Sequence, residues 1–190
     1  MRNTWRVAKG VRVQLLGAVR AWREGKEVEL RGVSSRSVLA RLALSPGTAV
    51  SIDTLTEALW GDDAPPNATG NLQASISRLR RGLGRESIGK VPGGYRLGAE
   101  VRTDVLELES VIEELAGREV GDAPSRLREL LAACSETPLA GVSPTIAFHP
   151  QRERLRELQL VAFDQMHRIS LDGGGAAASI PELRLRAEAE

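Results

Sequence analysis

Cysteine, histidine and aromatic residues are all scarce in this chain of 190 residues, and each shortage excludes a class of protein. Cys134 is the single cysteine, so no disulfide can form within the chain, and its helical spacing from nearby leucines predicts a buried, unreactive side chain. The two histidines, His149 and His167, belong to no Cys/His spacing typical of a metal site. We therefore expect no metal ion and no other cofactor.

Long apolar runs are also missing. No stretch approaches the roughly 18 apolar residues that a membrane-spanning helix requires. The N-terminal stretch carries Arg12 inside its short apolar run and has no small-residue cleavage site, so it is a poor signal peptide. Apolar residues make up 42% of the chain and charged residues 27%, which is typical of a soluble folded protein. The expected location is the cytoplasm, without membrane contact.

Charge is distributed unevenly, although the net charge is only +1. Residues 1–100 contain 16 Lys/Arg and 9 Asp/Glu, a net charge of +7, whereas residues 101–190 contain 10 and 16, a net charge of −6. A basic half followed by an acidic half indicates a nucleic-acid partner for the first and a different partner for the second.

Hydrophobic periodicity in the first half predicts small antiparallel sheets and three helices, an α+β arrangement. Strands are expected at residues 11–16, 19–22 and 28–30, helices at 34–44, 52–60 and 67–84, and a hairpin at 88–91 and 95–97. Ser34 or Ser35 is expected to cap the first helix, and Ser51 the second. The order of sheet, two helices, loop, basic helix and hairpin is that of a winged helix-turn-helix.

The second half predicts only helices. They are expected at residues 104–115, 123–135, 151–171 and 176–187, with Asp104 and Glu107 forming a capping-box-like start of the first. Antiparallel helix pairs of this kind resemble tetratricopeptide packing, although no repeat of about 34 residues is evident. The expected organisation is a leader at 1–10, a winged-helix domain at 11–100 and a helical domain at 101–190.

The helix expected at residues 67–84 is amphipathic. Its apolar stripe consists of Leu72, Ile76, Leu79 and Leu83. The face that points away carries Asn71, Ala74, Ser77, Arg78 and Arg81, with Gln73 and Arg80 on the flanks. This face has no acidic residue, so the helix is suited to a DNA major groove, where Arg pairs with guanine edges or phosphates. The alternative is a solvated basic surface.

Two other stretches resemble functional motifs. The spacing G-x-x-x-x-G-K at residues 84–90 matches a phosphate-binding loop, but Val91 replaces the required Ser/Thr and Pro92 prevents the following helix. With no hydrolase signature either, we expect no enzymatic activity. Asp62 and Asp63 lie in a proline-bounded loop, which is either a solvated turn or an acidic contact for a basic protein.

Several short motifs together resemble one known family. They are SIDTL at 51–55, ALWG at 58–61, LQ at 72–73, SRLRR at 77–81 and PGGY at 92–95. This set resembles the OmpR-type DNA-binding domain of the SARP regulators, transcriptional activators of actinomycete antibiotic pathways. The part after Val101 resembles their helical bacterial transcriptional activation domain, and it is shorter than is usual in the family.

The resemblance implies a mechanism and a set of site residues. Family members bind direct repeats upstream of promoters as side-by-side protomers and recruit RNA polymerase through its sigma factor. By this resemblance Asp62 and Asp63 are the sigma contact, and the protein is associated with the nucleoid. The expected DNA-binding residues, from the third helix and the wing hairpin, are Asn71, Gln73, Ser77, Arg78, Arg80, Arg81, Lys90, Tyr95 and Arg96.

One other function remains open from the sequence. The chain is alternatively a helical protein-interaction adaptor whose basic half binds an acidic protein. Affinity for duplex DNA that falls steeply with the logarithm of the salt concentration distinguishes the first function from the second.

Overall fold

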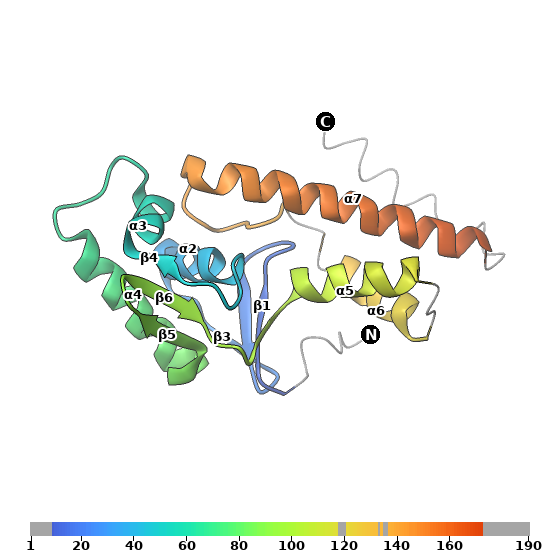
Figure 1. The fold of residues 1–190 in the computed structure, drawn as a ribbon, viewed down its shortest axis with the longest axis horizontal. Coiled ribbons are helices and arrows are strands. Elements are labelled where there is room, and N and C mark those ends of the chain that lie inside the picture. The colour runs from blue at the N-terminus through green and yellow to red at the C-terminus, as the bar shows by residue number, and fades with distance from the viewer. Residues whose placement is uncertain (1–8, 118–120, 133, 135–136, 173–190) are drawn as a thin grey trace.

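A computed structural model of the chain describes residues 9–117, 121–132, 134 and 137–172, and Figure 1 shows their arrangement. Of the expected leader, only Lys9 and Gly10 are among the described residues. The helix expected at 176–187 also lies outside them. Among the described helices, none combines the length and the apolar character needed to cross a bilayer.

A four-stranded sheet forms the N-terminal layer, in the order β3-β2-β1-β7. Strands β1 (Val11–Gln14), β2 (Arg20–Arg23) and β3 (Lys26–Val28) form the expected small antiparallel sheet. The expected bounds of the third strand, 28–30, are wrong, because Lys26 already pairs with Arg23 directly after the turn. Strand β7 (Val101–Thr103) pairs in parallel with β1, placing Val101 opposite Val11. The residues expected to begin the helical domain therefore complete the sheet of the first half.

Three helices and a second sheet form the winged part of the fold. The helices are α2 (Gly32–Ala43), α3 (Ile52–Trp60) and α4 (Ala68–Leu83), and the three-stranded sheet has the order β4-β6-β5 (Val50–Ser51, Gly94–Leu97 and Ile88–Val91). Ser51 caps α3 as expected, since its side chain accepts a 3.0 Å hydrogen bond from the Thr54 amide. The expected cap of α2 is wrong, because this helix begins before Ser34 and has no side-chain cap.

After β7, the elements of the described second half are all helices, which confirms the expected class for that part. It contains α5 (Asp104–Ala116), α6 (Ala123–Leu131) and α7 (His149–Asp172), and the short helices η1 (Arg85–Ser87) and η2 (Ile146–Phe148) complete the elements. Helix α6 ends at Leu131, before the expected residue 135. Figure 1 shows α7 lying along one side of the molecule, from α3 to α5 and α6.

The expected capping box at the start of α5 is wrong. The Thr103 side chain caps this helix by accepting a hydrogen bond from the Leu106 amide. Asp104 is instead 1% exposed, and its two carboxylate oxygens accept the backbone N–H groups of Leu15 at 2.8 Å and Leu16 at 3.0 Å. The carboxylate is drawn inward because the turn after β1 leaves these two donors without a strand partner.

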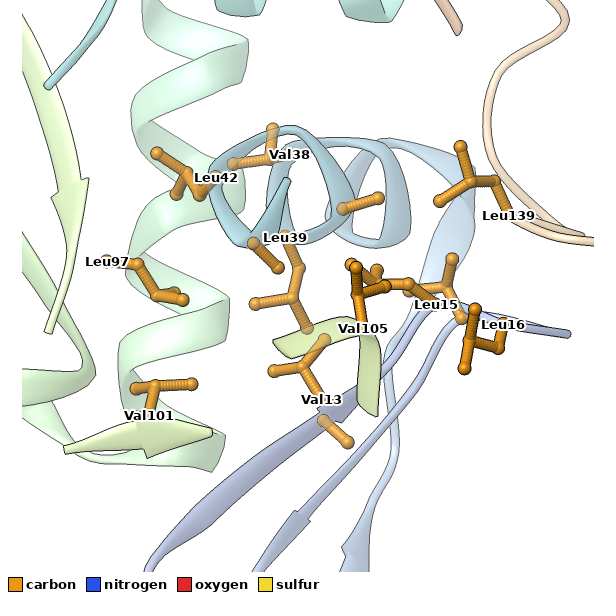
Figure 2. Packing of buried hydrophobic residues seen from close by; sticks show 14 of the residues in the cluster. Val13, Leu15, Leu16, Val38, Leu39, Leu42, Leu97, Val101, Val105 and Leu139 are labelled. Atoms are coloured by element: carbon orange, nitrogen blue, oxygen red, sulfur yellow. The ribbon is translucent and has the colours of Figure 1, made fainter. Parts of the chain in front are cut away.

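One hydrophobic core runs through both halves of the chain. Figure 2 shows Val13 of β1, and Leu15 and Leu16 of the turn after it, in one cluster with Leu39 of α2 and Val105 of α5. Cys134 is half-buried at the edge of this core, and burial raises the pKa of its thiol to about 12, which agrees with the expected unreactive side chain.

Residues 137–148, here called the connecting segment, run back from the helical half to the winged half. Ala140 pairs with Ala18 beside the first sheet, and the Arg36 side chain donates a 2.8 Å hydrogen bond to the Gly141 carbonyl. Further on, the Ser143 and Thr145 hydroxyls donate to the carbonyls at the end of α3. The segment therefore fixes the helical half against α2 and α3.

Candidate nucleic-acid interface

Helix α4 presents the amphipathic arrangement that its sequence predicts. Leu72, Ile76, Leu79 and Leu83 are all buried. On the other side the exposed residues are Asn71, Gln73, Ala74, Ser77, Arg78 and Arg81. The helix packs closely on the N-terminal sheet, since a Cβ atom at Gly82 would lie 2.6 Å from Val28. Packing thus holds the polar, acid-free face toward solvent.

Arg80 lies between α4 and the wing, the hairpin of β5 and β6. Its Nε atom donates a 2.8 Å hydrogen bond to the Ile88 carbonyl, and its guanidinium lies 5.8 Å from the centre of the Tyr95 ring. The side chain is only half-exposed. Arg80 therefore joins the wing to α4, a structural role that the sequence did not predict.

Tyr95 was expected at the surface, and the structure places it in the core. It is 5% exposed, and its neighbour two residues on, Leu97, is 1% exposed. Residues two apart on a strand share a face, so the ring turns toward the core together with Leu97. Its aromatic area is used for packing under Arg80 rather than for contact with a ligand.

The two charged wing residues lie on opposite faces of the hairpin. Lys90 is paired with Tyr95 and therefore shares the face that turns toward α4. Arg96 is paired with Gly89, on the other face. Both side chains are exposed. Of the two charged wing residues, Lys90 is thus the one on the side of α4.

Two arginines that the sequence did not single out extend the basic surface. Arg85 is exposed in η1, directly after α4. Arg23, from β2, is also exposed, and its guanidinium carbon lies 3.4 Å from the Cβ position of Gly84. The sequence could have indicated Arg85 as part of this surface, because it lies directly after α4 in the chain. No local signal exists for Arg23, because the fold brings it to the helix from 61 residues away.

The acidic loop, Asp62 and Asp63, lies between α3 and α4. Both residues are exposed, and neither forms an ion pair with another described residue. The backbone is ordered by a 3.1 Å hydrogen bond from the Asp63 amide to the Trp60 carbonyl. No cluster of three metal-ligating side chains occurs in the described part of the chain.

Comparison with known proteins agrees with this geometry. Residues 25–97 match the family model described as "Transcriptional regulatory protein, C terminal". Regulatory protein AfsR of Streptomyces coelicolor is 33% identical over 181 residues, which cover 91% of this chain and 18% of AfsR. Regulatory protein DnrI of Streptomyces peucetius is 28% identical over 189 residues, which cover 91% of this chain and 70% of DnrI.

A solved structure shares the fold. Mycobacterium tuberculosis EmbR, in complex with a low affinity phosphopeptide, matches with a TM-score of 0.76 and 25% identity, over 93% of this chain and 50% of EmbR. Residues 25–97 thus form an OmpR-type winged helix-turn-helix domain. The chain is a homologue of the SARP-family regulators, which confirms the resemblance found in its motifs.

Proposed function

We propose that this chain is a sequence-specific DNA-binding transcriptional activator. The observation that carries the proposal is the exposed face of α4, which is basic, polar and free of acidic residues within a winged helix-turn-helix. In this proposal α4 enters the major groove of promoter DNA. Residues 11–100 supply DNA binding, and residues 101–190 act as the helical activation domain.

The exposed side chains divide into two roles on DNA. Arg78 and Arg81 suit guanine edges or phosphates, while Asn71 and Gln73 have the amide groups that pair with adenine. Ser77 lies between them. Lys90, with Arg23 and Arg85, suits phosphate contacts that orient the domain on the duplex. We assign Arg96 to contacts with phosphates beyond the wing. Arg80 has the structural role of holding the wing against α4.

Replacing Arg78 or Arg81 with alanine is expected to weaken promoter binding by about 1–3 kcal/mol for each side chain that meets a base edge. Fluorescence anisotropy on duplex DNA, repeated over a salt series, measures the loss. Arg128→Ala removes another exposed arginine, from α6, and serves as the control. Unchanged affinity in both α4 variants would contradict the assignment. Salt-independent, weak DNA binding would favour the adaptor function instead.

The proposal extends to activation. By analogy with the family, protomers bind side by side on direct repeats, and Asp62 and Asp63 contact the sigma factor of RNA polymerase. Genes for antibiotic biosynthesis are the proposed targets. The exposure of both carboxylates, without an ion pair among the described residues, supports their availability to a basic partner.

The double replacement of Asp62 and Asp63 by asparagine is expected to leave DNA affinity unchanged and to lower transcription from the bound promoter. Both side chains are exposed, so the change should not disturb folding. Transcript yield with RNA polymerase holoenzyme measures the effect, and Glu113→Gln, an exposed acid on α5, is the control. An unchanged yield would remove the proposed sigma contact.

A further inference from the structure

An isolated apolar side chain projects from the connecting segment. Ile146, in η2, is 75% exposed, the largest value among the exposed large hydrophobic residues of the described chain. Two residues on, Phe148 is fully buried. The buried Phe148 anchors the short helix and leaves Ile146 directed away from the core, where it has no packing role within the described residues.

Hydrogen bonds hold this segment against the end of α3. The Ser143 hydroxyl donates to the Leu59 carbonyl at 2.7 Å, and the Thr145 hydroxyl donates to the Ala58 carbonyl at 3.1 Å. These carbonyls belong to the last turn of α3, where no further helical N–H group follows. The position of η2 relative to α3 is therefore fixed in advance of any binding.

The same contacts place η2 beside the acidic loop. A methyl group of Thr145 lies 3.9 Å from the Cβ position of Gly61, the residue that directly precedes Asp62 and Asp63. Thr145 in turn directly precedes Ile146. The residue before Ile146 thus contacts the residue before the two exposed carboxylates, although more than 80 residues separate the two segments in sequence.

We infer that Ile146 and the acidic pair Asp62–Asp63 form one docking surface for a protein segment that carries Lys or Arg beside an apolar side chain. Charge complementarity selects the basic residues, and Ile146 supplies the apolar contact that holds them. A rigid surface loses little conformational entropy on binding. The inference rests on the proposed function, in which the partner is a basic surface of RNA polymerase holoenzyme.

Replacing Ile146 with serine tests this surface. The variant is expected to lower activated transcription by holoenzyme about tenfold, the scale of one central contact residue. Ile146→Leu keeps the apolar group and is expected to retain most activity. DNA affinity stays unchanged in both. Leu160→Ser removes a half-exposed apolar side chain from α7 and is the matched control.

The outcomes distinguish the composite surface, which includes Ile146, from the contact made by Asp62 and Asp63 alone. When Ile146→Ser is combined with the asparagine replacements of Asp62 and Asp63, the losses should be less than additive, because the three residues serve one contact. If the acidic replacements lower transcription while Ile146→Ser matches the Leu160→Ser control, the composite surface is overturned and the loop contact stands. If neither change lowers transcription while promoter binding is intact, both are overturned.

Discussion

Replacing Asp104 with alanine is expected to lower the free energy of unfolding by about 2–5 kcal/mol, since each buried donor left without a partner costs about 1–3 kcal/mol. The carboxylate accepts the backbone N–H groups of Leu15 and Leu16 at a position that is 1% exposed. Alanine leaves both donors without an acceptor and adds a cavity. Urea unfolding followed by circular dichroism measures the loss.

Asp63→Ala is the control for this prediction. It removes an exposed carboxylate that has no partner among the described residues, so its effect should stay within about 0.5 kcal/mol. A loss below about 1 kcal/mol in Asp104→Ala would mean that the two amides find another acceptor.

The same side chain predicts a dependence of stability on pH. Burial raises the pKa of Asp104 to about 7, against the opposing effect of the hydrogen bonds from Leu16 and Leu15. A carboxyl group with a raised pKa binds its proton more tightly in the folded state than in the unfolded state. Its contribution to stability is therefore complete below about pH 4 and is lost as the pH rises through about 7.

Asp104→Asn separates this contribution from other titrations. The asparagine variant has no proton to release at this position, so the wild type should lose stability between about pH 4 and about pH 7 relative to the variant. Parallel pH profiles of the two proteins would contradict the assignment.

Replacing Gly94 with alanine is expected to disrupt the wing. A Cβ atom at this position would overlap the carbonyl oxygen of Val50, and it would lie 2.8 Å from the Val50 carbonyl carbon. These are backbone atoms of the neighbouring strand, so relief requires β4 and β6 to separate. We expect a loss of about 3 kcal/mol in unfolding free energy, at the upper end of overpacking effects. DNA affinity should fall with it.

Gly89→Ala provides a matched control on the facing strand. The nearest atom to its added Cβ is the Arg96 carbonyl oxygen at 3.8 Å, an ordinary contact distance. Stability and DNA binding should remain near wild type. If Gly94→Ala behaves like Gly89→Ala, the close approach of β4 and β6 is not essential to the wing.

The sequence alone determined the local features of this protein. The spacing of apolar residues in α4 predicted its buried and exposed faces, which the structure confirms from Leu72 to Arg81. The sequence predicted Ser51 as a helix cap, and its proline and glycines at 92–94 predicted the hairpin. These features follow from helical periodicity, capping and turn geometry, each of which operates within about ten residues.

Only the tertiary structure decided which distant segments meet. It buried Tyr95 under Arg80, brought Arg23 to the end of α4 and placed Ile146 beside the acidic loop. It also paired β7 with β1 and turned Asp104 from an expected cap into an acceptor for the first sheet. A local pattern determines which face of an element is apolar, but the partner of that face depends on how the whole chain packs. Burial and hydrogen bonding stabilise a contact whatever the sequence separation of the two residues.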